Sequence, residues 1–379
     1  MGTISDLTKM NYESISEDSV TIIESKTETC HATVGDINKY INVKTANANL
    51  LNEWINALEI NGTDSYVYKN DYMMRELLNS GFFRNSDIAK YYAIVWAGNN
   101  NVSLVDYLEY NEKFSVTHKQ MGDIEWEVLV KNWENDGTVT FRMSKIAQLM
   151  PFDAKEPTTP DSSDYTFTDT SGNISNRKKY GNNRWSVSNI RLWLNSVASD
   201  GNWFSKQHDY DESPNGSNIW INSYTSWAGF LAGFPSEFVS AIKATTKRTA
   251  LNTVIDAIIL GKTYEDTTDK IWLLSRYELN LGTEAGIIEG SVVNGTVIQK
   301  PYPCFTDNTS RLLYPNEYCL AHNDNYTTSA YGDGKTWTYW MRSPLSGNSY
   351  AARRVWEAGP LGGNNAYGGG IGLAGCLRI

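Results

Sequence analysis

The sequence predicts an α+β protein in which a small, mainly helical N-terminal domain precedes a strand-rich domain. Apolar residues recur at helical spacing, between start and stop signals, through most of the first 110 residues. From about Asp123 the pattern changes to short alternating strands, turns and aromatic residues, and eleven of the 13 tryptophans follow residue 120. A chain of 379 residues also exceeds the commonest size of one core, so we expect two domains, 1–120 and 121–379.

Capping residues and apolar spacing predict four short helices in the first domain, after an extended stretch at 18–28. We interpret their apolar stripes as core packing, the usual role of such a face. The residues that define the helices are Leu51, Trp54, Ile55 and Leu58 for the first, Asp71 and Gly81 for the second, Ser86 and Gly98 for the third, and Ser103, Leu104 and Leu108 for the fourth.

The second domain reads as strands joined by long connections. Residues 125–130 and 138–143 alternate on either side of a turn at 134–137, which predicts a β-hairpin. The polar insert 153–183 is expected to be loop rather than framework. Ser186 is placed to cap a helix at 187–194, Pro235 to start another, and the apolar run 271–274 is short enough to be a buried strand.

Charge and composition exclude several classes of protein. Lysine and arginine number 33 against 43 acidic residues, a net charge of -10, so nucleic acid is not an expected partner. No apolar run approaches the roughly 20 residues of a membrane helix, and the first residues lack the basic and apolar regions of a signal peptide.

Cysteine and histidine spacing indicates neither a metal site nor a disulfide framework. None of Cys30, Cys304, Cys319 and Cys376 forms a C-x-x-C pair, and the four histidines are widely dispersed. We favour buried free thiols, while a Cys304–Cys319 pair stays open for an oxidising compartment. No cofactor and no metal are predicted.

Five motifs stand in a fixed order along the second domain. They are IEWEVL at 124–129, RWSVSNIRLWLN at 184–195, DKIWLLSRYE at 269–278, WMRSP at 340–344 and GLAGCLRI at 372–379. In this order the motifs resemble the C-type lectin fold of variable proteins from diversity-generating retroelements, a bacterial and phage branch whose fold is similar to that of formylglycine-generating enzymes. The resemblance covers about 121–379 and implies a C-type lectin-like domain there, although Ala374 and Gly375 stand where the family usually has an Arg-Pro pair.

The polar, glycine-rich segment 345–370 lies between two of these motifs, and the resemblance implies that it is the variable, ligand-binding surface. All its residues except Trp356 and Glu357 can be encoded by an AAC codon whose adenines are replaced, the substitution that diversification makes. A plain glycine-rich turn region is the alternative, and Trp356 is alternatively a core residue beside Val355. The candidate ligand-binding residues are Leu345, Ser346, Asn348, Ser349, Tyr350, Arg353, Trp356, Glu357, Asn364, Asn365 and Tyr367.

Two other functions stay open as alternatives. A formylglycine-generating oxidase needs a reactive cysteine pair, yet neither Cys304 nor Cys319 has a basic neighbour in sequence. A calcium-dependent glycan lectin needs carboxylate and amide oxygens, of which YPNE at 314–317 and NDN at 323–325 form a partial set.

The expected function is therefore non-enzymatic binding of a macromolecule, protein or glycan, on a target cell surface. The resemblance implies a phage receptor-binding protein on the virion, or a bacterial cell-surface protein, with residues 1–120 attaching or orienting the domain, for instance on other virion proteins. Related display proteins are often homotrimers, which raises avidity. The sequence itself has no trimerisation heptads.

Overall fold

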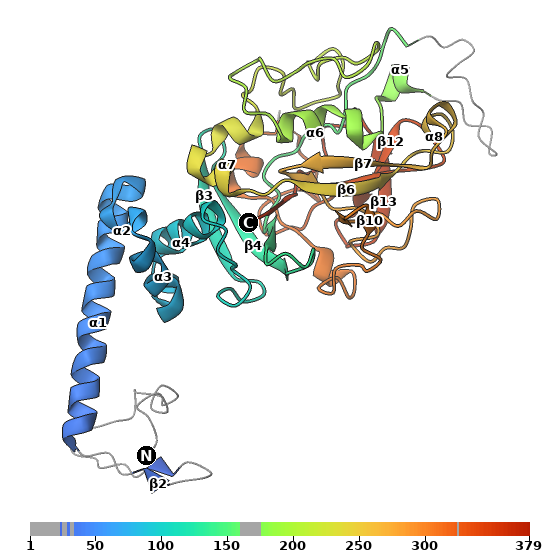
Figure 1. The fold of residues 1–379 in the computed structure, drawn as a ribbon. Coiled ribbons are helices and arrows are strands. Elements are labelled where there is room, and N and C mark those ends of the chain that lie inside the picture. The colour runs from blue at the N-terminus through green and yellow to red at the C-terminus, as the bar shows by residue number, and fades with distance from the viewer. Residues whose placement is uncertain (1–22, 25–28, 31–33, 160–175, 324–325) are drawn as a thin grey trace. The chain divides into compact units, whose positions relative to one another are not determined.

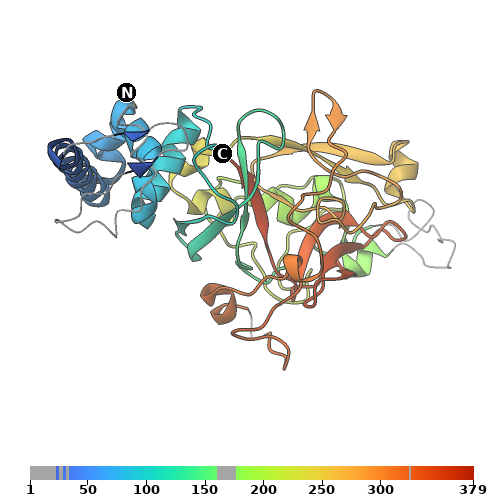
Figure 2. The same cartoon turned by 90° about the horizontal axis from the view of Figure 1, so that it is seen from below.

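The computed structural model describes residues 23–24, 29–30, 34–159, 176–323 and 326–379, with side chains from residue 48 on (Figure 1, Figure 2). The chain divides into two compact units, Met1–Leu77 and Leu78–Ile379. Its architecture is mixed α/β, with a helical N-terminal region and a β-rich C-terminal part. In the described ranges, no helix combines the length and the apolarity that crossing a membrane requires.

The helices are α1 (Val34–Asn61), α2 (Tyr66–Lys69), α3 (Asp71–Ser80), α4 (Asp87–Asn99), α5 (Arg177–Tyr180), α6 (Asn189–Leu194), α7 (Ser236–Ala241), α8 (Asp256–Leu260) and α9 (Glu317–Ala321). The strands are β1 (Ile23–Glu24), β2 (Thr29–Cys30), β3 (Lys113–His118), β4 (Gly122–Lys131), β5 (Val139–Met143), β6 (Thr245–Ala250), β7 (Tyr264–Asp269), β8 (Trp272–Leu273), β9 (Val292–Val293), β10 (Thr296–Val297), β11 (Tyr339–Pro344), β12 (Ala351–Val355), β13 (Leu361–Asn365) and β14 (Gly375–Arg378). Part of the predicted extended stretch 18–28 lies outside the described residues.

Three of the four predicted N-terminal helices are present. Ser86 caps α4 by accepting the Ala89 backbone N–H at 3.3 Å, and Gly81 ends α3 in the left-handed region, where glycine avoids the Cβ clash. The predicted fourth helix is wrong. The chain makes a single turn after Ser103, and the left-handed Asn111 then leads it into β3.

The predicted domain boundary at residue 120 lies inside a β-hairpin. Residue 120 is in the turn between β3 and β4, which pair with each other. Helix α4 also packs on α7 of the second unit. A Cβ on Gly98 of α4 would come within 2.8 Å of the Ala241 Cβ and 2.5 Å of Ile379, so only glycine allows this approach. Helix α4 therefore belongs with the β-rich part.

An antiparallel five-stranded sheet, in the order β3-β4-β5-β14-β8, forms the main core of the second unit. The predicted hairpin corresponds to β4 and β5, and the predicted buried strand to β8. Trp126, Phe141 and Trp272 are fully buried on these strands. Helix α7 packs on the sheet, with the Phe238 ring 6.3 Å from Trp126. The helix predicted at 187–194 is α6, which Ser188 caps instead of Ser186, and the helix predicted to start at Pro235 is α7.

A three-stranded antiparallel sheet, β11-β12-β13, and the β6–β7 ribbon lie beside this core (Figure 1). A fully buried ionic cluster joins these layers. Arg342 of β11 donates to Glu278 at 2.5 Å and to the Thr249 hydroxyl of β6 at 3.1 Å. Lys247 of β6 reaches the same carboxylate at 3.2 Å and lies 4.3 Å from the Trp272 ring centroid.

Burial alone would raise the pKa of Glu278, but the charges of Arg342 and Lys247 outweigh it and lower the pKa to about 2. A second buried carboxyl, Glu289, accepts the Ala250 N–H at 3.0 Å and the Ser343 hydroxyl at 2.5 Å. For Glu289 burial dominates and raises the pKa to about 7. Glu278 therefore stabilises the fold in its charged form, at higher pH, whereas Glu289 stabilises the fold in its protonated form, at lower pH.

Replacing Arg342 with alanine is expected to lower the free energy of unfolding by about 3–5 kcal/mol, because it leaves Glu278 charged and buried. The matched control is Lys113→Ala, whose ion pair with Glu125 is 44% and 36% exposed and should matter by less than about 1 kcal/mol. Urea unfolding of both variants measures the difference. A loss below about 1 kcal/mol for Arg342→Ala would contradict this role for the cluster.

Glu289 is expected to make stability fall with rising pH. Its folded pKa lies above the ordinary carboxyl value of 4.5, so its contribution is complete below about pH 4.5 and is lost as the pH rises through about 7. Between pH 5.5 and pH 8 the wild type should lose about 2 kcal/mol relative to Glu289→Gln. Parallel unfolding curves at the two pH values measure this, and equal pH dependence in both proteins would contradict it.

Candidate functional site

The segment 345–370 forms a loop, the β12–β13 hairpin and a closing turn on the three-stranded sheet (Figure 1). Strand β12 lies in the middle of this sheet and pairs with β11, which carries the buried WMRSP motif. The candidate surface therefore belongs to the same three-stranded sheet as Arg342, which is buried in the core.

One amide holds the loop that precedes β12. The side-chain N–H groups of Asn183 donate to the carbonyl oxygens of Asn348 at 2.8 Å, Ala351 at 2.9 Å and Leu345 at 3.3 Å. Asn252 donates to the Asn183 side-chain oxygen at 3.0 Å, so the amide is fixed on both sides. All donors and acceptors of this fully buried side chain are used, which favours a single loop conformation.

Arg177 of α5 supports the same loop from its other side. Its Nε donates to the Ser349 carbonyl at 3.2 Å, and its Nη2 bonds the Asp256 carboxylate of α8 at 2.6 Å. Thr253, just before α8, donates through its backbone N–H to the Ser346 carbonyl at 2.9 Å. The loop is therefore bound from two separate helical segments.

Three half-buried tyrosine rings gather where these elements meet. Tyr180 of α5 lies 5.1 Å from Tyr350 and 5.8 Å from Tyr367, measured between ring centroids. Lys155 places its ammonium 5.0 Å from the Tyr367 ring, and Lys179 lies 5.2 Å from the Tyr180 ring. We call these five residues the tyrosine cluster. The structure brings together two of the predicted residues, Tyr350 and Tyr367.

Sequence reasoning missed Tyr180, Lys155 and Asn183, because it treated 153–183 as a loop without framework. A buried carboxyl organises the described parts of this insert. Asp153 accepts the backbone N–H groups of Asn182 at 3.0 Å and Asn189 at 2.9 Å, and burial raises its pKa, to which Asp211 and Glu156 add. In the sequence of this insert, polar residues alternate with turn-forming residues, and this pattern does not indicate that Asp153 is buried.

The guanidinium of Arg353, one of the candidate ligand-binding residues, is engaged within the fold. Its Nε and Nη2 bond the buried Glu284 carboxylate at 2.7 and 3.0 Å, and Arg276 bonds the same group at 3.0 Å. Ser346 also donates to Glu284, at 2.7 Å. Burial alone would raise the pKa of Glu284, but the bonds from Arg353 and Ser346 lower it overall. Arg353 and Ser346 therefore serve the framework.

Trp356 belongs to the surface rather than to the core. Its side chain is 37% exposed, while the neighbouring Val355 is fully buried. The Arg354 guanidinium lies 3.6 Å from the ring centroid. The indole also covers Gly362, where a Cβ would come within 2.2 Å of the indole nitrogen.

The remaining predicted residues divide between the surface and the loop frame. Asn348 accepts the backbone N–H groups of Tyr350 at 3.1 Å and Ala351 at 2.7 Å, so it shapes the turn. Ser349 is fully buried. Those that are partly exposed are Leu345, Glu357, Asn364 and Asn365.

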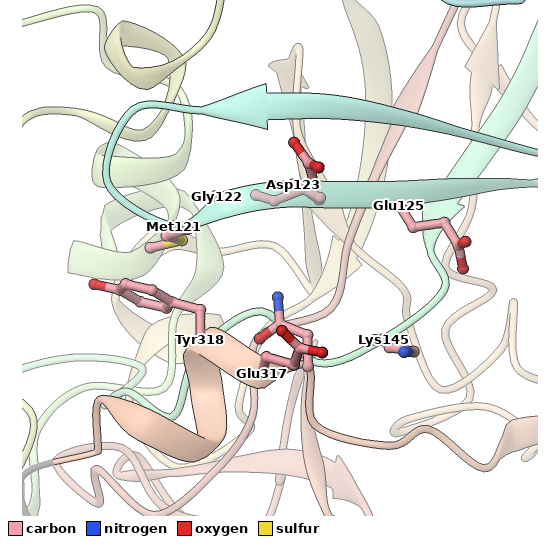
Figure 3. Close-up of a pocket in the computed structure, with 9 residues that line it drawn as sticks. Met121, Gly122, Asp123, Glu125, Lys145, Glu317 and Tyr318 are labelled. Carbon is pink, nitrogen blue, oxygen red and sulfur yellow. The ribbon is translucent and has the colours of Figure 1, made fainter. Parts of the chain in front are cut away.

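A pocket of about 450 Å³ lies elsewhere, between the start of β4 and α9 (Figure 3). None of the eleven candidate ligand-binding residues lines it, whereas Asn316 and Glu317 of the partial calcium motif do. Its carboxylates are largely engaged, since Glu125 accepts Lys113 at 2.7 Å and Ser144 at 2.5 Å, and Asp123 accepts the Thr117 hydroxyl at 2.5 Å. We therefore centre the candidate site on the tyrosine cluster.

The cysteines lack the features of reactive thiols. Cys304, Cys319 and Cys376 are free, and burial raises the pKa of Cys304 to about 11 and that of Cys319 to about 12. The side chain of Cys30 lies outside the described part. Such thiols stay protonated near neutral pH, and a protonated thiol is a weak nucleophile.

The partial calcium motif has other uses in this fold. Asn316 caps α9 by accepting the Cys319 N–H at 2.8 Å, and Asn323 donates back to the Leu320 carbonyl at 3.3 Å. Residues 324 and 325 lie outside the described chain. Within the described ranges no group of three or more His, Cys, Asp or Glu side chains is arranged to hold a metal ion.

Replacing Asn183 with alanine should loosen the 345–351 loop, because the Asn348 carbonyl loses its donor and the Leu345 and Ala351 carbonyls each keep only a backbone donor. The expected loss of stability is about 1–3 kcal/mol, with faster hydrogen exchange at 345–351 than in the core sheet. The control is Asn202→Ala, since Asn202 bonds only its own exposed turn. Unchanged exchange at the loop would contradict the anchoring role.

Comparison with known proteins gives one family. A family model described as "Domain of unknown function (DUF6273)" matches residues 162–379. Neither the curated proteins nor the solved structures contain a match to the chain. The matched residues include four of the five sequence motifs, the loop anchors Arg177 and Asn183, and all three tyrosines of the cluster. Since the model covers more than half of the chain, this protein belongs to the DUF6273 family.

Proposed function

We propose that this protein is a non-enzymatic binding protein whose β-rich part has a C-type lectin-like fold and recognises a macromolecule through the segment 345–370. The proposal includes diversification of that segment by a retroelement, as in the variable proteins that the five motifs resemble. It places the protein on a phage virion or a bacterial cell surface, facing a ligand on a target cell.

The observation that carries the proposal is the tyrosine cluster beside a loop whose main-chain carbonyls are held by the side chains of Asn183 and Arg177. Tyrosine gives a large contact area at a small cost in side-chain entropy, which is why binding loops favour it. A loop held in one conformation before binding also loses little entropy when the ligand docks. The bonds from Asn183 and Arg177 supply that order.

Three side chains weigh against the two alternative functions, a formylglycine-generating oxidase and a calcium-dependent lectin. The high pKa values of Cys304 and Cys319 disfavour the thiolate that formylglycine-type oxidation would need. The amide oxygen of Asn316, part of the predicted calcium set, is used as a helix cap.

The binding proposal predicts that Tyr350→Ala and Tyr367→Ala together reduce binding to target cells by about 10- to 100-fold, as interface tyrosines do. The measurement is binding of the labelled full chain to a panel of intact bacterial strains. Tyr314→Ala, at a tyrosine 46% exposed and outside the segment, is the control. Equal binding by the double variant and the control would contradict this surface.

The diversification proposal predicts a second near-copy of the DNA that encodes 345–379, close to the gene and differing from it almost only at adenines. Sequencing the neighbouring DNA tests this. Without such a copy the diversification proposal fails, while binding by the tyrosine cluster is still tested by the cell assay.

A further inference from the structure

Strand β13 is an edge of the three-stranded sheet, because it pairs with β12 on one side and with no described strand on the other. All five of its residues are partly exposed. The strand lies between Trp356 at the turn before it and Tyr367 in the turn after it, so it crosses the candidate site.

The direction of its backbone groups follows from two hydrogen bonds that flank the strand. Trp356 donates its N–H to the Pro360 carbonyl at 2.9 Å, and Ala366 donates to the Tyr350 carbonyl at 2.8 Å, in the same register as the β12–β13 ladder. Hydrogen-bonded and non-bonded pairs alternate in an antiparallel ladder. The N–H and C=O groups of Leu361 and Gly363 therefore point outward, where the structure gives them no partner among the described residues.

Natural edge strands are usually protected by charges, proline or a bulge. Strand β13 reads Leu-Gly-Gly-Asn-Asn and pairs with β12 without a register shift, so it has none of these devices. Edge strand β3, by contrast, carries Lys113 in an ion pair with Glu125. Two adjacent glycines also leave the β13 backbone uncovered by side chains of its own.

The flanking side chains border this edge on both faces. The Trp356 indole covers Gly362, and the Leu345 Cδ1 lies 2.9 Å from the position of a Cβ on Gly363. Adjacent residues of a strand face opposite sides, so Trp356 and Leu345 lie on opposite faces of β13. A strand added here would find an apolar contact for side chains on each face.

From this arrangement we infer that β13 binds an extended polypeptide segment of the ligand as an additional antiparallel or parallel strand. The inference rests on the proposed function and narrows its ligand class to a polypeptide. Outward N–H and C=O groups repeat every second residue, about 6.4–6.8 Å apart, which matches the backbone of another strand. The hydroxyl groups of a glycan have no such repeat.

The test uses the purified full chain and a displayed library of random dodecapeptides. The best peptide selected on the wild type is measured against Gly363→Ala and Gly363→Pro. Both variants add carbon beside Leu345, but only proline removes the outward N–H. An edge strand tolerates proline at such a position, because the missing N–H is not part of the sheet's own ladder. Since both variants displace Leu345 alike, they are compared with each other, and we expect Gly363→Pro to bind the peptide at least about tenfold more weakly than Gly363→Ala.

A second measurement avoids dependence on the folding of Gly363→Pro. The same peptide, N-methylated at alternate backbone positions, should bind the wild type at least about tenfold more weakly in one of the two methylation phases. Equal binding of both methylated forms, or failure to select any peptide on the wild type, would overturn the inference. If Tyr350→Ala with Tyr367→Ala loses cell binding while Gly363→Pro keeps it, the strand inference fails and the proposed function stands.

Discussion

The buried pair of Arg342 and Glu278 is the interaction on which the arrangement of the β-rich unit depends. Arg342 belongs to β11 and Lys247 to β6, so two separate strands meet at the Glu278 carboxylate, which lies in the turn region after β8. A charge removed from water is costly unless each partner is in place. The cluster therefore favours one register of β11, and through β12 it sets the position of the β12–β13 hairpin.

A second carboxylate, Glu284, limits how far the segment 345–370 can vary. It is 1% exposed and is paired with Arg353 inside the segment and Arg276 outside it. Without Arg353, the Glu284 carboxylate would keep only Arg276 as a charged partner, in a site that water barely reaches. Diversification of this segment, as proposed, would then have to spare Arg353 and act on residues such as Tyr350 and Tyr367, whose rings lie at the surface.

The elements with strong local signals were predictable, and contacts between distant segments were not. Ser86 and the apolar spacing gave α4, and the alternation around 134–137 gave the β4–β5 hairpin. The stretch after Ser103 has a cap and two leucines but makes only one turn, because Asn111 redirects it into β3. Of the site, Tyr350 and Tyr367 were foreseen, whereas Tyr180 and the Arg353 ion pair depend on partners about 70 to 190 positions away.

The anchoring of the loop is compatible with the proposed diversification of the segment 345–370. Asn183 and Arg177 donate to carbonyl oxygens of Leu345, Asn348, Ser349 and Ala351, not to their side chains. A carbonyl is present whatever residue occupies the position, so these bonds persist through most substitutions. The outward N–H of Leu361 and Gly363 on β13 is equally independent of side chains. Main-chain groups thus position the segment, and under the proposed function exposed side chains such as those of Tyr350 and Tyr367 would determine which ligand binds.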